Sequence, residues 1–213
     1  MAEISPYLPG IMLAYTAFFL AIMSPGPNIL AVIGTSMSVG RSSGIALAFG
    51  VSAGSFCWAL ITVLGLSALL ASFSPALIAI KIAGGLYLLW LSYKSFKSAA
   101  SSFDIEAKTL DGDMKTLLSF FRRGLMIQMT NPKAALAWIA IISLGLTEGA
   151  PLWVGFAIVV GTAVLSAVIH YIYAVAFSTP FMVRIYSRAR RWIQGVLGSF
   201  FAFAGITMLT NRL

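Results

Sequence analysis

The sequence predicts an all-α integral membrane protein in which six transmembrane helices form two inverted three-helix repeats. Of its 213 residues, 60% are hydrophobic and only 9% are charged, and the mean hydropathy is +0.95. In a soluble domain, about a quarter of the residues are charged. The apolar residues gather into six runs, each long enough to cross a bilayer core of about 30 Å. The first and fourth runs carry proline-containing breaks. We therefore expect a single membrane domain over residues 1–213.

The six apolar runs divide the chain into two halves of three. They span roughly Leu8–Val39, Ile45–Leu70, Ala76–Tyr93, Leu117–Leu146, Leu152–Phe177 and Ile193–Leu209. The first half covers about residues 8–93 and the second about residues 117–211, with a polar linker over about residues 94–116. Because each half has an odd number of spans, the second half enters the bilayer from the opposite side, which predicts an inverted repeat. In the second run, the spacing of Ala46, Gly50 and Gly54 predicts close packing against a neighbouring helix.

The first run is broken at Ser24-Pro25-Gly26-Pro27-Asn28, and the fourth is broken at Thr130-Asn131-Pro132-Lys133. Each proline lacks a backbone N–H and clashes with the carbonyl group one turn earlier, so neither run can continue as one straight helix. Backbone groups freed within a membrane need partners inside protein or in a water-filled cavity. Interrupted spans at corresponding positions of two halves are a pointer to a transporter binding site. The alternative is that the two breaks are unrelated structural kinks.

The lysines and arginines predict the orientation of the chain in the membrane. Most of the 14 lie on the connections between runs one and two, three and four, and five and six. These residues are Arg41, Lys94, Lys97, Lys108, Lys115, Arg122, Arg123, Arg184, Arg188, Arg190 and Arg191. Because cytoplasmic connections carry an excess of Lys and Arg, both termini are expected on the outer side of the membrane. We attribute the net charge of +8 to topology and lipid headgroups, and expect no nucleic acid partner.

Residues at the two breaks are predicted to bind a substrate. A half-helix that begins at a break presents unpaired N–H groups and the positive end of its dipole, which attract a carboxylate. A half-helix that ends there presents carbonyl oxygens, which suit an ammonium group. Proline fits the first turn of the new half-helix, and asparagine amides both donate and accept hydrogen bonds. The predicted substrate-binding residues are Pro25, Gly26, Pro27, Asn28, Thr130, Asn131, Pro132 and Lys133.

Ionisable and polar side chains in the spans are candidates for ion coupling or for the substrate pathway. An intramembrane lysine is costly, so Lys133 is expected to bind a substrate carboxylate or to release a proton during coupling, unless carbonyl groups at the break satisfy it. His170, the only histidine, shares a helical face with Tyr173, and it either relays protons or packs as a hydrogen-bonded core residue. Lys81 and Gln128 complete this set, and Lys81 can instead snorkel to the outer surface.

The sequence contains no motif of an enzyme active site. The GxSxG, HExxH, P-loop and Rossmann glycine patterns are all absent. The lone cysteine, Cys57, cannot form an intrachain disulfide or a CxxC pair, which argues against a membrane redox carrier. Asp111-Gly112-Asp113 lacks the further ligands of a metal-binding loop. We therefore expect no catalytic residue, no metal site and no cofactor.

Three stretches of the chain match the signatures of a known family. Pro25-Gly26-Pro27-Asn28 matches a PGPN signature, Gly84 to Leu91 match a G-x-x-YL-x-(W/Y)-L pattern, and Phe121 to Trp138 match a stretch with F-x-x-G, NPK and a later tryptophan. Together they resemble the lysine exporter and homoserine/threonine exporter (LysE/RhtB) family over nearly the whole chain. The resemblance implies an exporter of an amino acid or amino acid derivative in the bacterial inner membrane, driven by the proton motive force. It does not indicate which amino acid.

These observations lead us to expect a secondary-active exporter that alternates access around the two broken helices. Its partners would be an amino acid substrate, protons as the coupling ion and the lipid bilayer, with a homo-oligomer as a further option. Three alternatives stay open at this point: a passive channel, a lipid-handling membrane protein, and a structural or signalling subunit. A membrane redox carrier is less favoured.

Overall fold

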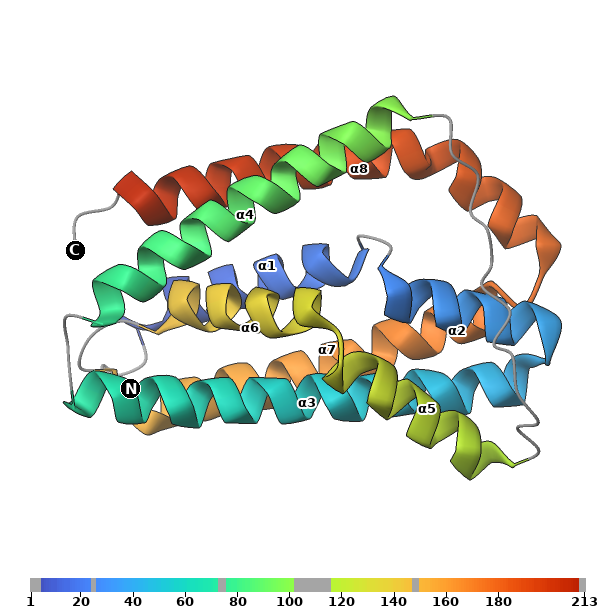
Figure 1. The fold of residues 1–213 in the computed structure, drawn as a ribbon, viewed down its shortest axis with the longest axis horizontal. Helices are drawn as coiled ribbons and strands as arrows, with labels where there is room; N and C mark the ends of the chain where they lie inside the picture. The colour runs from blue at the N-terminus through green and yellow to red at the C-terminus, as the bar shows by residue number, and fades with distance from the viewer. Residues whose placement is uncertain (1–4, 24–25, 73–75, 102–115, 147–149, 211–213) are drawn as a thin grey trace.

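The computed structural model describes residues 5–23, 26–72, 76–101, 116–146 and 150–210. Within these ranges the chain forms eight α-helices and no strand, which confirms the predicted all-α fold (Figure 1). The helices are α1 (Leu8–Met23), α2 (Pro27–Ser38), α3 (Arg41–Ser72), α4 (Ala76–Ala100), α5 (Leu117–Met129), α6 (Pro132–Gly145), α7 (Leu152–Ala176) and α8 (Pro180–Thr210).

Both predicted breaks are present. The first run consists of α1 and α2, which are bent by 51°, and the fourth consists of α5 and α6, which are bent by 64°. Pro27 and Pro132 are the first residues of α2 and α6, where a missing N–H removes no helical hydrogen bond. Gly26 and Asn131 precede them in extended backbone. Each proline therefore starts a new half-helix, as the sequence predicts.

The described helices support a multi-pass membrane protein. Three of them are long and apolar enough to cross a membrane individually, within Arg41–Leu66, Leu152–Ala176 and Arg184–Thr210. Counting each bent pair as one span raises the number to five among the described residues. The third predicted run corresponds to α4, which is not among these five, so the six-span arrangement stays a prediction.

The helix α4 extends past the predicted start of the polar linker. The sequence places it near residue 94, whereas α4 continues through residue 100, so Lys94 and Lys97 lie on the helix. Lysine is a good helix former, and Arg190 supplies partners for the last turn of α4. Its Nη2 atom donates hydrogen bonds to the carbonyl oxygens of Ser98 and Ser101, at 2.8 and 2.7 Å. Residues 102–115, which hold most of the predicted linker, lie outside the described residues.

The last helix begins before the sixth apolar run. The apolar run begins near Ile193, whereas α8 begins at Pro180. Proline suits the first turn of a helix, and the arginines that follow it have high helix propensity. The four arginines predicted to lie in a connection are therefore helical. They are Arg184, Arg188, Arg190 and Arg191.

The helices α4 and α8 form a pair beside the other six described helices (Figure 1). Glycines allow this pair to pack closely, since a Cβ atom at Gly205 would lie 3.0 Å from the carbonyl oxygen of Gly85. A small apolar cluster that includes Leu88, Ala140 and Phe201 joins the pair to α6. The larger apolar cluster lies mostly among the other six described helices, and it also includes Tyr186 of α8. The two clusters share the partly buried residues Ala21, Met23 and Leu144, so the pair is joined to the rest of the described fold by apolar contacts.

The small-residue stripe predicted on the second run packs against α5. A Cβ atom at Gly50 would collide with the carbonyl group of Phe121, and one at Gly54 would lie 2.8 Å from Cβ of Gln128. In the opposite direction, a Cβ atom at Gly124 would collide with the carbonyl group of Leu47. This close approach fixes the end of α5, and therefore the second break, against the middle of α3.

Candidate functional site

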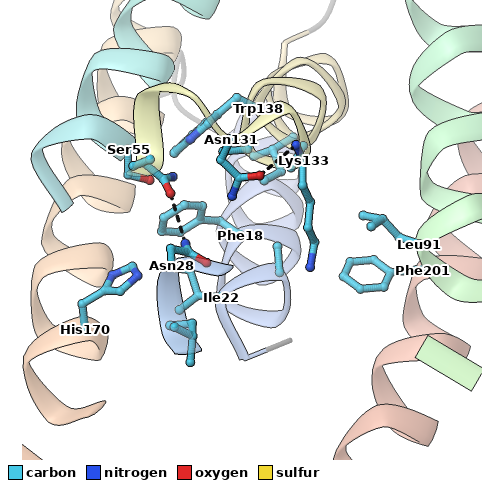
Figure 2. Close-up of a pocket in the computed structure, with 16 residues that line it drawn as sticks. Phe18, Ile22, Asn28, Ser55, Leu91, Asn131, Lys133, Trp138, His170 and Phe201 are labelled. Atoms are coloured by element: carbon cyan, nitrogen blue, oxygen red, sulfur yellow. Dashed lines mark hydrogen bonds between the residues drawn. The ribbon is translucent and has the colours of Figure 1, made fainter. Parts of the chain in front are cut away.

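The two breaks face one cavity, the central cavity, which lies at their level in the molecule (Figure 2). It offers about 50 Å³ to the centres of water-sized molecules, which is enough for a few waters. All eight described helices contribute residues to its walls. The lining residues are Phe18, Ala21, Ile22, Asn28, Ile29, Ser55, Leu91, Gln128, Asn131, Lys133, Ala134, Ala137, Trp138, Ile141, His170 and Phe201.

A larger cavity, the vestibule, adjoins the central cavity. Both are lined by Leu91, Asn131 and Lys133, and the vestibule has a volume of about 440 Å³ by the same measure. It extends along α4 past Lys94 and Ser98. In Figure 1 this direction leads to the end of the molecule where α2, α4 and α7 finish and α3, α5 and α8 begin. We call it the basic end, because Lys94 and Lys97 near the end of α4 and the arginines of α5 and α8 lie there.

At the first break, Asn28 of α2 contacts Gln128 of α5. The Nδ2 atom of Asn28 donates a hydrogen bond to Oε1 of Gln128 at 3.1 Å, which links the two halves of the chain. A methyl group at Gly26 would lie 3.1 Å from Oδ1 of Asn28 and 3.7 Å from Nζ of Lys133. The Asn28 oxygen and the Lys133 amine therefore converge on the same small volume beside Gly26.

At the second break, side chains satisfy the freed backbone. Oδ1 of Asn131 accepts a hydrogen bond from the backbone N–H of Lys133 at 3.0 Å and caps α6. The hydroxyl of Tyr87 donates to the carbonyl oxygen of Lys133 at 2.9 Å. Nε1 of Trp58 donates to the carbonyl oxygen of Gln128 near the end of α5, at 3.2 Å. With the backbone held in this way, the half-buried Lys133 side chain extends toward Phe201 (Figure 2).

Lys133 has no described carboxylate near it. All six Asp and Glu residues of the sequence lie outside the described ranges. The polar groups that share the central cavity with Lys133 are amides, a hydroxyl and an imidazole. A buried amine in such surroundings is suited to an anionic ligand group.

His170 lies across the central cavity from Lys133 (Figure 2). Its side chain is only 1% exposed. Nδ1 lies 2.8 Å from the carbonyl oxygen of Ser166, 3.2 Å from the hydroxyl of Ser166 and 3.5 Å from the hydroxyl of Ser52. Nε2, the other ring nitrogen, is buried and has no hydrogen-bond partner within the described part of the chain.

The structure brings most of the predicted site residues to these two cavities. Asn28, Gln128, Asn131, Lys133 and His170 line the central cavity, and Gly26, Pro27 and Pro132 join Asn131 and Lys133 around the vestibule.

Two predicted residues have other positions, and two are not placed by the structure. Thr130 is exposed, and its hydroxyl donates to the carbonyl oxygen of Met126. Tyr173 lines a separate apolar groove between α7 and α8, with its hydroxyl 3.7 Å from the sulfur of Met23. Pro25 lies outside the described residues, and so does the side chain of Lys81.

Sequence reasoning missed several aromatic residues at the site. Tyr87 and Trp58 hold the backbone of the second break, and Phe18 packs on Trp138 with ring centroids 4.8 Å apart. Tyr87 and Trp138 both fall within the family-like stretches, which was the available signal for them. No comparable signal marks Phe18 or Trp58, since an aromatic residue in an apolar run is usually lipid-facing or core.

The site has the composition of a binding site for a small polar molecule. It combines one amine, three carboxamides, one hydroxyl, one imidazole and an aromatic wall. In the described residues there is no group of three or more His, Cys, Asp or Glu side chains that could hold a metal ion. A compact zwitterion matches this arrangement, because the amine can pair with a carboxylate and the amide oxygens with an ammonium group.

Comparison with known protein families gives one match that covers most of the chain. The sequence profile of the family described as LysE type translocator matches residues 19–212.

Relatives of known sequence extend the comparison. The threonine efflux protein of Escherichia coli (strain K12) is 30% identical over 197 residues, which cover 91% of this chain and 94% of that protein. The threonine efflux protein of Salmonella typhimurium is similar to the same extent, with 30% identity over 91% of this chain and 94% of its own length. The uncharacterized membrane protein YahN of Escherichia coli (strain K12) is 29% identical over 90% of this chain and 85% of its own length. No solved structure matches the chain significantly.

Proposed function

The chain belongs to the family of LysE type translocators, and from this premise we propose that it exports a small neutral amino acid or derivative across the bacterial inner membrane, driven by protons. Members of this family are transporters, so the chain is a membrane transporter and not an enzyme. Two of the three relatives described above bear on the substrate, since they are threonine efflux proteins.

One observation carries the proposal: Asn28 and Gln128 join the two broken spans by a hydrogen bond beside Lys133. We place the substrate carboxylate at Nζ of Lys133, which has no described counter-charge. The substrate ammonium group then lies near Oδ1 of Asn28, which converges with Lys133 on the space beside Gly26. Both charged ends of one small zwitterion can be held in this way.

The size and charge of the site favour a small neutral substrate. The central cavity is narrow, and the aromatic rings of Phe18, Trp138 and Phe201 line it. A cationic side chain would meet Lys133 without a carboxylate in the described surroundings, and such a like-charge pair is unfavourable. We therefore propose a compact, uncharged side chain on the substrate.

The packing of the helices supports an inverted repeat of six spans. A two-fold axis in the membrane plane would exchange α3 with α7 and α4 with α8. These are pairs that pack on each other, and the members of each pair run in opposite directions in Figure 1. We propose that α4 is the sixth span, and that the α4–α8 pair moves against the remaining helices.

The cavities support alternating access. The vestibule joins the central cavity to the basic end, and the positive-inside rule assigns this end to the cytoplasm and both termini to the outside. At the opposite end, Gly10 packs on Gly145 and Gly84 packs on Met208. We infer that the structure is the state in which the substrate enters from the cytoplasm.

The proposal is tested by exchange in liposomes. Purified protein should accumulate radiolabelled threonine in vesicles preloaded with unlabelled threonine, because a carrier exchanges substrate across the membrane. Efflux should accelerate when the external medium is made acidic, and a protonophore should remove this acceleration. A passive channel would show no stimulation by substrate on the far side.

Lys133→Met supplies the site-specific test. The variant should insert and fold but lose exchange by about a hundredfold or more, because the carboxylate loses its charged partner. Lys97→Met is the matched control, since Lys97 is an exposed residue of α4 that lines neither cavity. Exchange by Lys133→Met at the wild-type rate would remove the carboxylate from this position.

A further inference from the structure

The buried imidazole of His170 has a ring nitrogen that no described group of the protein contacts by a hydrogen bond. Nδ1 lies 2.8 Å from the carbonyl oxygen of Ser166. A carbonyl oxygen can only accept a hydrogen bond, so Nδ1 carries the ring hydrogen and Nε2 of the neutral ring is an acceptor. Two hydroxyl oxygens also lie near Nδ1, that of Ser166 at 3.2 Å and that of Ser52 at 3.5 Å. The Ser52 hydroxyl donates to the carbonyl oxygen of Ala48 at 3.0 Å, so its oxygen faces Nδ1 as an acceptor.

Nε2 is the ring nitrogen without a partner. It is buried, it has no hydrogen-bond partner in the described residues, and His170 lines the central cavity. Figure 2 shows the ring extending from α7 toward Asn28, from the wall opposite Lys133. Buried acceptors in native proteins are nearly always satisfied by protein, water or ligand. A donor brought in by the ligand would satisfy this one.

The position of the charged groups decides which part of the ligand reaches His170. This step rests on the proposed function, in which the substrate carboxylate pairs with Lys133 and the ammonium group lies near Asn28. Both groups are attached to the same carbon atom of an amino acid, so both stay near Gly26. The side chain is then the part of the substrate that extends across the central cavity toward His170 (Figure 2).

We propose that Nε2 of His170 accepts a hydrogen bond from a hydroxyl group on the substrate side chain, and that His170 is therefore a specificity-determining residue. A site built to bind a hydroxyl discriminates strongly against an isosteric analogue that lacks it, because the buried acceptor is then left unpaired. Threonine and valine form such a pair, since they differ by a hydroxyl in place of a methyl group. We therefore expect the wild-type protein to bind threonine at least about tenfold more tightly than valine.

Two substitutions separate the role of Nε2 from that of Nδ1. His170→Asn keeps a side-chain N–H that can donate to the carbonyl oxygen of Ser166, but it has no atom at the position of Nε2. His170→Gln is longer and can place an acceptor oxygen near that position. Thr162→Val is the matched control, because Thr162 is a fully buried residue of α7 whose hydroxyl bonds within its own helix and lines neither cavity.

The experiment measures threonine and valine binding to detergent-purified full-length protein by isothermal titration. In His170→Asn, threonine affinity should fall about tenfold while valine affinity stays within about twofold, so the ratio approaches one. His170→Gln should recover part of the preference, and Thr162→Val should keep all of it. An unchanged ratio in His170→Asn would overturn the assignment.

The ratio of threonine to valine affinity in the wild-type protein tests the assignment without any variant. This test remains valid if His170→Asn does not fold. Equal binding of threonine and valine by the wild-type protein would overturn the role of His170, because a trapped water would then serve Nε2 equally with either ligand. Liposome exchange distinguishes this failure from failure of the proposed function. Exchange of both amino acids at equal rates would leave export intact, whereas selective threonine binding without exchange would leave His170 as a specificity residue of a protein that does not export.

Discussion

At the scale of single residues, the site depends on Lys133, a cation held where no described carboxylate can neutralise it. An amine within a membrane protein is costly to bury, so its surroundings must stabilise it. The backbone around it is fixed by Asn131 and Tyr87, which bond to the N–H and the carbonyl group of Lys133 itself. The backbone from which the side chain extends is therefore fixed, and the amine at the end of the side chain is left to contact a ligand.

Gly26 gives the sharpest prediction at this scale. Its backbone has φ −122° and ψ −178°, an extended conformation that any residue adopts, so alanine there costs no backbone strain. Its methyl group would lie 3.1 Å from Oδ1 of Asn28 and 3.7 Å from Nζ of Lys133, in the space assigned to the substrate. We expect Gly26→Ala to weaken threonine binding about tenfold. Isothermal titration measures this change.

A thermal unfolding scan shows whether Gly26→Ala acts on the site or on the fold. Its midpoint should stay close to that of the wild-type protein. Gly195→Ala is the control for binding, since nothing lies within 4 Å of a Cβ atom at Gly195. Wild-type threonine affinity in Gly26→Ala would move the substrate away from this break.

At the scale of helices, the beginning of α6 depends on one side-chain cap. The Asn131 side chain is 8% exposed, and its Oδ1 atom accepts from the Lys133 N–H. Removing an N-cap side chain costs about 1 kcal/mol, which lowers the unfolding midpoint of a chain of this size by roughly 3 °C. Asn131→Ala should show this loss in a thermal scan. Asn131→Ser should retain most of the stability, because a serine hydroxyl can also cap, and equal midpoints for the two variants would mean that the cap does not stabilise α6.

The contact between α3 and α5 predicts opposite effects for two glycine substitutions on one helix. Alanine has a helix propensity about 1 kcal/mol more favourable than glycine, so Gly65→Ala, with open space around its Cβ atom, should stabilise the protein. Gly50→Ala should destabilise it, because the new methyl group meets the carbonyl group of Phe121. Chemical or thermal unfolding in detergent compares the two. If both substitutions stabilise the protein, α3 and α5 do not pack as described.

The helix breaks could be predicted because they depend on local chemistry. The site could be predicted only in part, because it depends on contacts between residues that are far apart in the sequence. Pro27 and Pro132 end one half-helix and begin another through their own missing N–H groups, which needs no tertiary information. The contact of Asn28 with Gln128 joins residues 100 positions apart, and no periodicity in the sequence identifies it. Periodicity placed Tyr173 on the face of His170, yet its hydroxyl meets Met23 in another groove.

Charge patterning also had limits. It identified the basic end, because lysine and arginine cluster where helices meet the membrane surface. It did not locate the start of α8, since arginine is both a topology signal and a good helix former. The contact of Arg190 with the end of α4 is a tertiary interaction that charge patterning does not reveal.

At the scale of the whole molecule, the cavities of the proposed substrate path lie toward one end, and helices pack closely at the other. The vestibule reaches Ser98 on the basic side. At the far end, a Cβ atom at Gly10 would lie 2.9 Å from the carbonyl oxygen of Gly145, and one at Gly145 would lie 2.9 Å from Cβ of Ala14. These glycines let α1 and α6 close the path on that side. A carrier must break this packing when it opens outward. The contact therefore stabilises the described state relative to the outward-open state.

Gly10→Ala should therefore shift that equilibrium away from the described state. The methyl group meets a backbone carbonyl that cannot move aside easily, and overpacking of this kind costs about 1–3 kcal/mol. The shift can be measured with Ser98→Cys in a Cys57→Ser background. The new thiol reacts with a membrane-impermeant maleimide added from the basic side, and its rate of reaction reports how often the vestibule is open. We expect labelling to slow several-fold in Gly10→Ala, because the vestibule is open for a smaller fraction of the time. Gly65→Ala in the same background should label at the original rate. Unchanged labelling in a folded Gly10→Ala variant would show that the α1–α6 contact does not distinguish the two states, and the α4–α8 pair alone would then have to control access.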